Sequence, residues 1–291
     1  MNDIKKYIPS LIFSIILVFA LLGLTLSFTA EKYANPKKLI SISEQNDITS
    51  MVESELENYF KDKYNETGIP AEVYMNAITP EYIEANIKGI INSGFKVLEG
   101  EKNVVFSAEK SEALLEKNIT DFFESYAEEN GYEKDADYEK KLTATIDSAY
   151  KTVREYCDIY KLVTINSEGI LSKVGVIYRH LHMLTSFLAG ACAIIAIIIL
   201  FINFKKLACA VYWFGVSTLV SGVIGLIPCI ILNASNYFDR FVIKQAHIFT
   251  SFTKLLYGSV NSFMVLQLIL IAVSAVIFGS YVFFIRTKKS V

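Results

Sequence analysis

The sequence predicts an all-α membrane protein: a four-helix transmembrane bundle with an extracytoplasmic helical domain inserted between spans 1 and 2. Three observations predict this fold. Four apolar blocks each have the roughly 20 apolar residues that a helix needs to cross a hydrocarbon core. Charged residues are concentrated between the first two blocks. Within that charged region, apolar residues recur at three- and four-residue steps, which is typical of amphipathic helices.

The distribution of charged residues divides the chain into a segment expected in water and segments expected in lipid. Residues 31–180 carry 28 Asp and Glu against 18 Lys and Arg, a net charge of −10, whereas the rest of the chain carries 2 against 10, a net charge of +8. We therefore expect an acidic helical domain at 31–180, flanked by a first span in 1–30 and by spans 2–4 in 181–291. The acidic surface would repel phosphate, which excludes nucleic acid as a partner.

The first apolar block is Ile8–Ala30, which follows the basic residues Lys5 and Lys6. A basic start before an apolar run is also typical of a signal peptide. Because Phe28 breaks the small-residue pattern of a cleavage site at Ala30, we expect an uncleaved signal-anchor helix and a cytoplasmic N-terminus.

The second and third blocks, Met183–Ile202 and Leu207–Leu232, are joined by only four residues. This spacing predicts an antiparallel hairpin in the membrane. The fourth block is near Asn261–Phe284. The two termini and the joint at 203–206 hold seven Lys and Arg, against three in loop 233–260, so the positive-inside rule predicts cytoplasmic termini. The predicted localisation is a multi-pass cell-membrane protein with residues 31–180 extracytoplasmic.

The acidic domain is predicted to be helical throughout. An apolar stripe runs from Ile48 to Tyr64, and a short helical turn follows at 70–75. Thr79 before Pro80 is typical of an N-cap followed by proline at the first helical position. We expect the helix that starts there to stop near Gly94.

The middle of the domain contains one irregular stretch, Phe95–Phe106, where a small hairpin and a plain loop both remain open. Ser107 is expected to cap a helix that ends before Gly131. A longer helix is expected from about Asp135, with apolar residues aligned as far as Tyr160. Ser167 is expected to cap a last helix that continues without a break into the second span.

Loop 233–260 carries apolar residues at helical spacing, which predicts an amphipathic helix near 235–257. Two placements remain open for it: on the outer lipid headgroups, or docked under the helical domain.

The four apolar blocks contain no Asp, Glu, Lys, Arg or His. A path for ions or protons normally requires such groups. Small residues at four-residue spacing, such as Ser217, Ser221 and Gly225, instead favour close helix packing. A polar stripe of Ser217, Ser221, Asn233 and Gln267 facing one cavity would favour the alternative function of a transporter or channel subunit.

The helical domain has no His before position 180, no cysteine pair and no Gly-rich phosphate loop. We therefore predict no catalytic, cofactor-binding or metal-binding residue, no cofactor, and no enzymatic activity. Cys157 is interpreted as a small buried residue. Whether His180, His182 and His247 converge is left open; only if they shared a site would a metal centre or an envelope enzyme be supported.

Twelve of the 17 tyrosines fall in residues 31–180, most of them in apolar stripes. Exposed tyrosines among acids are consistent with a binding face for a cationic or a carbohydrate-like partner. The functional hypothesis is a non-enzymatic integral membrane protein whose extracytoplasmic domain binds a partner or stimulus, as a sensor, adaptor or accessory subunit of an envelope complex. The expected partners are the lipid bilayer and a protein partner or a second copy of the chain.

Two resemblances accompany this hypothesis. Residues 8–203 resemble, in topology, the four-helix sensor module of bacterial chemoreceptors, but no cytoplasmic signalling helix follows Phe204. The stretch Val97–Ile119, in which Leu-Glu-Gly leads into Phe106 and the next helix, is similar to uncharacterised bacterial membrane proteins. That resemblance implies one span, a helical extracytoplasmic domain and three further spans, and it implies no activity.

Overall fold

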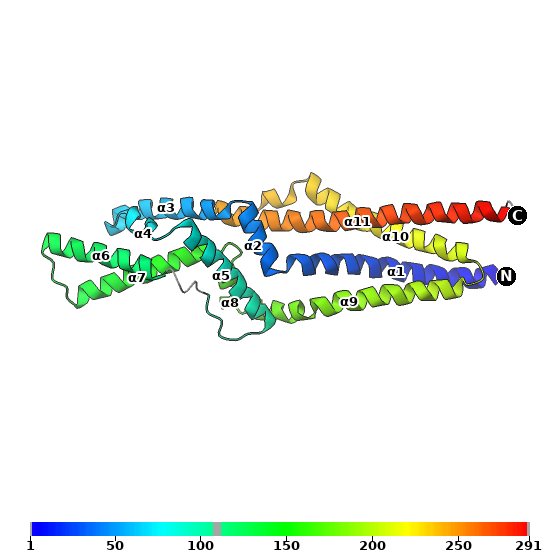
Figure 1. Ribbon diagram of the computed structural model, residues 1–291, viewed down its shortest axis with the longest axis horizontal. Coiled ribbons are helices and arrows are strands. Elements are labelled where there is room, and N and C mark those ends of the chain that lie inside the picture. Colours follow the sequence, from blue (N-terminus) through cyan, green and yellow to red (C-terminus); the bar gives the residue numbers. More distant parts are fainter. Residues whose placement is uncertain (1, 107–111, 290–291) are drawn as a thin grey trace. The chain divides into compact units, whose positions relative to one another are not determined.

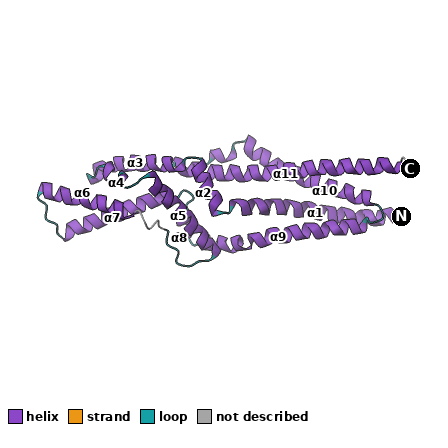
Figure 2. Cartoon of the chain, viewed as in Figure 1, coloured by secondary structure: helices purple, strands orange, loops and turns teal. Residues whose placement is uncertain are grey.

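The computed structural model describes residues 2–106 and 112–289, and every regular element in those ranges is a helix (Figure 2). Four of the helices are long and apolar enough to cross a membrane, over Tyr7–Tyr33, Ile170–Ile202, Leu207–Ala234 and Ala246–Phe283. The predicted all-α class and the four predicted apolar helices are therefore confirmed. The protein has the character of a membrane-embedded chain.

The chain folds into two compact units (Figure 1). Unit 1 consists of the chain up to Ala34, His180–Phe241 and the chain from Leu255 onward. Unit 2 consists of Asn35–Arg179 together with Val242–Lys254. Helices α9 (Ile170–Ile202) and α11 (Ala246–Lys289) contribute residues to both units without a break.

Unit 1 is organised around α1 (Asn2–Tyr33), whose buried hydroxyl groups bond to each of the other three helices. Ser14 and Ser217 of α10 (Leu207–Ala234) lie 2.7 Å apart between their hydroxyl oxygens. The Gln267 side chain of α11 donates to the hydroxyl of Thr25 at 2.9 Å. From α9, Thr185 bonds to Ser27 at 2.6 Å. These bonds fix the contacts of α1 where apolar side chains alone would not distinguish one rotation from another.

Glycines let α10 and α11 approach closely. A methyl group added at Gly222 would lie 2.7 Å from Ile271 and 3.0 Å from the backbone oxygen of Gln267. At Gly225 it would lie 2.6 Å from the Gln267 side chain. The close backbone approach that the small-residue spacing predicts for this span is confirmed.

Within the described residues, unit 2 contains seven complete helices, the first part of α9 and the first turns of α11. The core is rich in isoleucine: Ile48, Ile83, Ile87, Ile90 and Ile91 are each at most 2% exposed. The helices are, in chain order, α2 (Pro36–Gln45), α3 (Ile48–Thr67), α4 (Ala71–Met75), α5 (Pro80–Glu99), α6 (Glu112–Asn130), α7 (Ala136–Cys157) and α8 (Leu162–Ser167).

Most helix starts in unit 2 follow from local side chains. The hydroxyl of Thr79 accepts from the backbone N–H of Tyr82, with Pro80 opening α5 as predicted. The Asp135 carboxylate accepts from two backbone N–H groups and begins α7 where the sequence places it. Helix α2 is an element that the sequence analysis missed, although Asn35 before Pro36 carries the same cap signal.

The predicted stop at Gly94 is wrong, because α5 continues to Glu99 and ends at Gly100, whose φ is +101°. A methyl group at Gly94 would lie 2.8 Å from the Leu162 side chain. Gly94 therefore serves the close packing of α8 on α5, not helix termination. Residues 101–106 are non-helical and form no hairpin, and the expected cap at Ser107 lies outside the described residues.

Two further boundaries differ from expectation. Ser167 ends α8, and α9 begins at Ile170 after Gly169, whose φ is +69°; from there α9 runs unbroken as predicted. Residues 235–257 do not form one amphipathic helix. They comprise a 3₁₀ turn at Tyr237–Arg240, a non-helical segment at 241–245 and the start of α11. Of this stretch, Val242–Lys254 belongs to unit 2.

Candidate ligand-binding cleft

Unit 2 contains an open cleft of about 630 Å³, formed by the end of α3, by α4 and by the facing sides of α6 and α7. Its volume is in the range of pockets that hold small molecules. All of its lining residues belong to unit 2.

Aromatic rings form much of the cleft wall. Phe60 stacks on Tyr74 with ring centroids 4.1 Å apart and planes within 9° of parallel. Phe122 stacks on Tyr126, one helical turn later, with centroids 6.1 Å apart. Phe60 and Tyr74 are each 4% exposed, whereas Tyr59, Phe122 and Phe123 are partly exposed. The aromatic lining residues are Tyr59, Phe60, Tyr74, Phe122, Phe123 and Tyr126.

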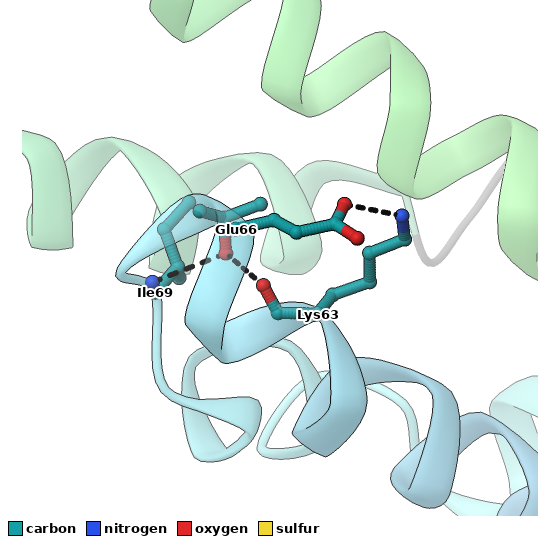
Figure 3. Close-up of polar contacts among 4 residues, drawn as sticks. Lys63, Glu66 and Ile69 are labelled. Atoms are coloured by element: carbon teal, nitrogen blue, oxygen red, sulfur yellow. Dashed lines mark hydrogen bonds and ion pairs between the residues drawn. The ribbon is translucent and has the colours of Figure 1, made fainter.

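The end of α3 shapes one side of the cleft (Figure 3). Gly68 has a φ of +71°, a conformation that favours glycine, and it ends the helix. The hydroxyl of Thr67 donates to the backbone oxygen of Lys63 and accepts from the backbone N–H of Ile69. This turn leads the chain back through α4, which places Tyr74 against Phe60.

The charged groups of the lining are neutralised by neighbouring side chains. Lys63 pairs with Glu66 at 2.5 Å, as Figure 3 shows, and Lys141 pairs with Asp137 at 2.7 Å. Hydrogen bonding to these carboxylates raises the pKa of both lysines, which keeps them protonated. Four hydroxyl-bearing side chains also line the cleft: Thr67, Thr145, Ser148 and Thr152.

The Tyr74 side chain adds a neutral phenol to the wall. It is 4% exposed, and burial raises its pKa to about 12. Glu66 is the one acid in the lining, where there is neither imidazole nor thiol. A hydroxyl nucleophile needs an adjacent base to be activated. The groups that this lining offers are those of recognition: ring faces, hydroxyls and paired charges.

Two of the three histidines that the sequence singled out, His182 and His247, each lie beside a different glutamate. His182, in unit 1, lies 2.7 Å from Glu31 through its Nδ1 atom. His247 is fully buried in unit 2, with its Nδ1 atom 3.0 Å from Glu55, although the two groups are not aligned for a hydrogen bond. No group of three or more His, Cys, Asp or Glu side chains within the described ranges is arranged to hold a metal ion.

Glu55 also positions the start of α11. Its carboxylate accepts from the backbone N–H of His247 at 3.3 Å, near the positive end of that helix. The His247 ring stacks on Tyr156 of α7, with centroids 5.7 Å apart. These contacts attach the first turns of α11 to α3 and α7 within unit 2.

The remaining residues considered from the sequence have structural surroundings. Cys157 is 1% exposed, and burial raises the pKa of its thiol well above the usual range, so its interpretation as a small buried residue is confirmed. In unit 1, Ser217 bonds to Ser14 and Gln267 bonds to Thr25. Asn233 bonds to Asn261 near the end of α10.

The sequence analysis missed the cleft. Tyr59 and Phe60 lie in the apolar stripe that runs from Ile48 to Tyr64, and spacing along one helix does not show whether a second helix covers such a stripe.

Comparisons with protein-family models, with curated proteins and with solved structures find no match to this chain. The functional argument therefore depends on the residues themselves.

Proposed function

We propose that the chain is a non-enzymatic integral membrane protein whose extracytoplasmic helical domain binds a partner or stimulus in the aromatic cleft. It would serve as a sensor, an adaptor or an accessory subunit of an envelope complex. The observation that carries this proposal is the cleft: about 630 Å³, walled by six aromatic rings, in a unit separate from the apolar bundle.

The composition of the cleft supports binding without chemistry. Glu66 is bonded to Lys63 and exposed, so it lacks the apolar surroundings that turn a carboxyl group into a general acid or base at neutral pH. The described lining residues that could act as a base toward these hydroxyls are Glu66, which is ion-paired with Lys63, and the lysines Lys63 and Lys141, each of which pairs with a carboxylate.

The alternative of a transporter or channel subunit has less support. Its sequence-based argument required polar groups of the spans to face one cavity. Ser217, Asn233 and Gln267 instead bond to Ser14, Asn261 and Thr25 on other helices. Ser221, the fourth residue of that stripe, is fully buried, and its hydroxyl has no hydrogen-bond partner within the described residues.

Sidedness is tested by cysteine labelling of intact cells with a membrane-impermeant maleimide. Ser148→Cys lies in the cleft lining, and Lys205→Cys lies in the joint between α9 and α10; both positions are exposed in the structure. We expect labelling of Ser148→Cys before permeabilisation and of Lys205→Cys only after it, with the parent chain as the baseline. The reverse order would contradict the proposed topology.

Binding is tested on the full chain in nanodiscs, with 4-trifluoromethylphenylalanine placed at Phe123 in the cleft. The matched control carries the same label at Phe95, which packs against Tyr178 outside the cleft lining. We expect fractions of envelope extract or culture medium to shift the fluorine signal at Phe123 and not at Phe95. If no fraction shifts the signal at Phe123, the cleft is not a binding site.

A further inference from the structure

We infer that the cleft of unit 2 recognises a saccharide: a neutral, hydroxyl-rich ring compound held by stacking on aromatic faces. This inference rests on the proposed function and names the ligand class for the same site. It follows from the shape of the ring surfaces, from the charge balance of the lining and from the distribution of hydroxyl groups.

The ring surfaces suit a flat ligand with weakly polar faces. Phe122 and Tyr126 lie with ring planes within 22° of parallel, and Tyr126 also stacks on Tyr132 with centroids 6.0 Å apart, yet Tyr126 remains 51% exposed. The C–H groups of a sugar ring carry partial positive charge and are attracted to the electron-rich face of an aromatic ring. The part of the Tyr126 ring that these two neighbours leave exposed is therefore available for stacking.

The charge balance disfavours ionic ligands. A cation would need an unpaired acid, but Glu66, the one acid in the lining, is bonded to Lys63. An anion would need an unpaired base, but Lys63 and Lys141 each have a carboxylate partner, and the surrounding segment 31–180 carries a net charge of −10. A neutral ligand avoids the cost of placing an unpaired charge in the cleft.

The polar groups of the lining match a ligand with many hydroxyls. The Lys63–Glu66 pair offers donors and acceptors at adjacent atoms and is exposed to solvent. Side-chain hydroxyls on α7, from Thr145 to Thr152, are spaced along the same cleft. The Thr145 hydroxyl donates its hydrogen to the backbone oxygen of Lys141, so it can accept from a ligand hydroxyl, whereas a hydroxyl without such a bond can donate or accept. Ring faces and hydroxyls in one cleft are the two elements that such a ligand requires.

The test uses the full chain in nanodiscs with the fluorine label at Phe123. Three neutral trisaccharides (maltotriose, cellotriose and N,N′,N″-triacetylchitotriose) are titrated beside two charged ring probes, phenethylammonium and benzoate. We expect at least one trisaccharide to shift the signal to saturation with a Kd below about 1 mM, and the charged probes to bind at least about tenfold more weakly.

Variants of Tyr126 distinguish a loss of ring stacking from general effects on the fold. Tyr126→Ala should weaken the trisaccharide about tenfold or more, whereas Tyr126→Phe, which keeps the ring, should stay within about twofold. The matched control is Tyr64→Ala, since Tyr64 is 52% exposed on α3 and lies outside the cleft lining; it should leave the affinity unchanged.

The outcomes distinguish this inference from the proposed function. A shift by phenethylammonium or benzoate alone overturns the saccharide and leaves the cleft as a binding site for that charge class. A trisaccharide affinity that is equal in Tyr126→Ala and the parent overturns the stacking geometry. If neither the panel nor envelope extract shifts the signal, the saccharide inference and the proposed function both fail.

Discussion

The two units of this protein use polar side chains in opposite ways. In unit 1 several buried polar groups bond to one another across helices, as Ser14 does to Ser217 and Gln267 to Thr25. In unit 2 the largest fully buried side chains are aliphatic apart from His247, and ion pairs such as Lys63–Glu66 lie on the surface. In water, burial of apolar area drives packing. Between helices in lipid that force is absent, so small residues and hydroxyl bonds determine the contacts.

This comparison of the two units predicts that truncating a core side chain of unit 2 causes the largest loss of stability. Leu56 is fully buried, and Leu56→Ala should cost about 2–5 kcal/mol in the free energy of unfolding of this unit. The matched control is Leu114→Ala, because Leu114 is 48% exposed. Hydrogen exchange of α3 and α5 in the detergent-solubilised full chain measures the loss. Equal protection in both variants would mean that apolar burial does not hold unit 2 together.

A second, smaller loss of stability is expected when Asp158 is replaced, because it is the one buried carboxylate among the described residues of unit 2. Asp158 is 2% exposed and accepts from the backbone N–H groups of Leu162 and Val163, which begin α8. Asp158→Ala leaves both donors without this partner and should cost about 1–3 kcal/mol. Hydrogen exchange at α8 measures it.

The cost of Asp158→Ala should depend on pH. Burial raises the pKa of Asp158 above its ordinary value of 3.8. The stability that this group contributes is therefore fully present below pH 3.8 and is lost as pH rises through the folded-state pKa. The difference between the parent and Asp158→Ala should widen as pH falls through the folded-state pKa of Asp158 toward 3.8. A difference that narrows over this range would show that Asp158 is favoured as the charged form.

In unit 1 the comparison predicts sensitivity to added volume. Gly222→Ala brings a methyl group to 2.7 Å from Ile271 and should cost about 1–3 kcal/mol through overpacking of α10 on α11. The control is Gly279→Ala, since a methyl group there has no neighbour within 4 Å. For each variant, the fraction that still elutes as a single species after heating in detergent is measured, and the two fractions are compared. Matching thermal profiles would show that α10 and α11 separate more easily than their packing suggests.

The smallest expected effect is that of a single polar bond in the bundle. A double-mutant cycle of Thr25→Val and Gln267→Leu should give a coupling of about 0.6 kcal/mol, the average for such bonds in membrane proteins. Unfolding by sodium dodecyl sulfate measures it. A coupling of zero would mean that this bond adds no stability and that the glycine contacts alone determine how the helices pack.

The sequence by itself determined the local features of this protein. Uninterrupted apolar blocks gave the four long helices, because an isolated backbone in lipid must satisfy its own hydrogen bonds. The caps at Thr79 and Asp135 were readable because a cap bond spans only two or three residues.

The tertiary structure decided which helices meet. In the sequence Gly94 resembles a helix stop signal, but in the structure it packs against Leu162, which lies 68 positions later in the chain. Tyr59 of α3 and Phe122 of α6 line a cleft because the packed helices leave both side chains partly exposed. Periodicity determines which face of a helix is apolar; whether another helix, a ligand or water meets that face depends on distant segments, and one stretch of sequence does not encode it.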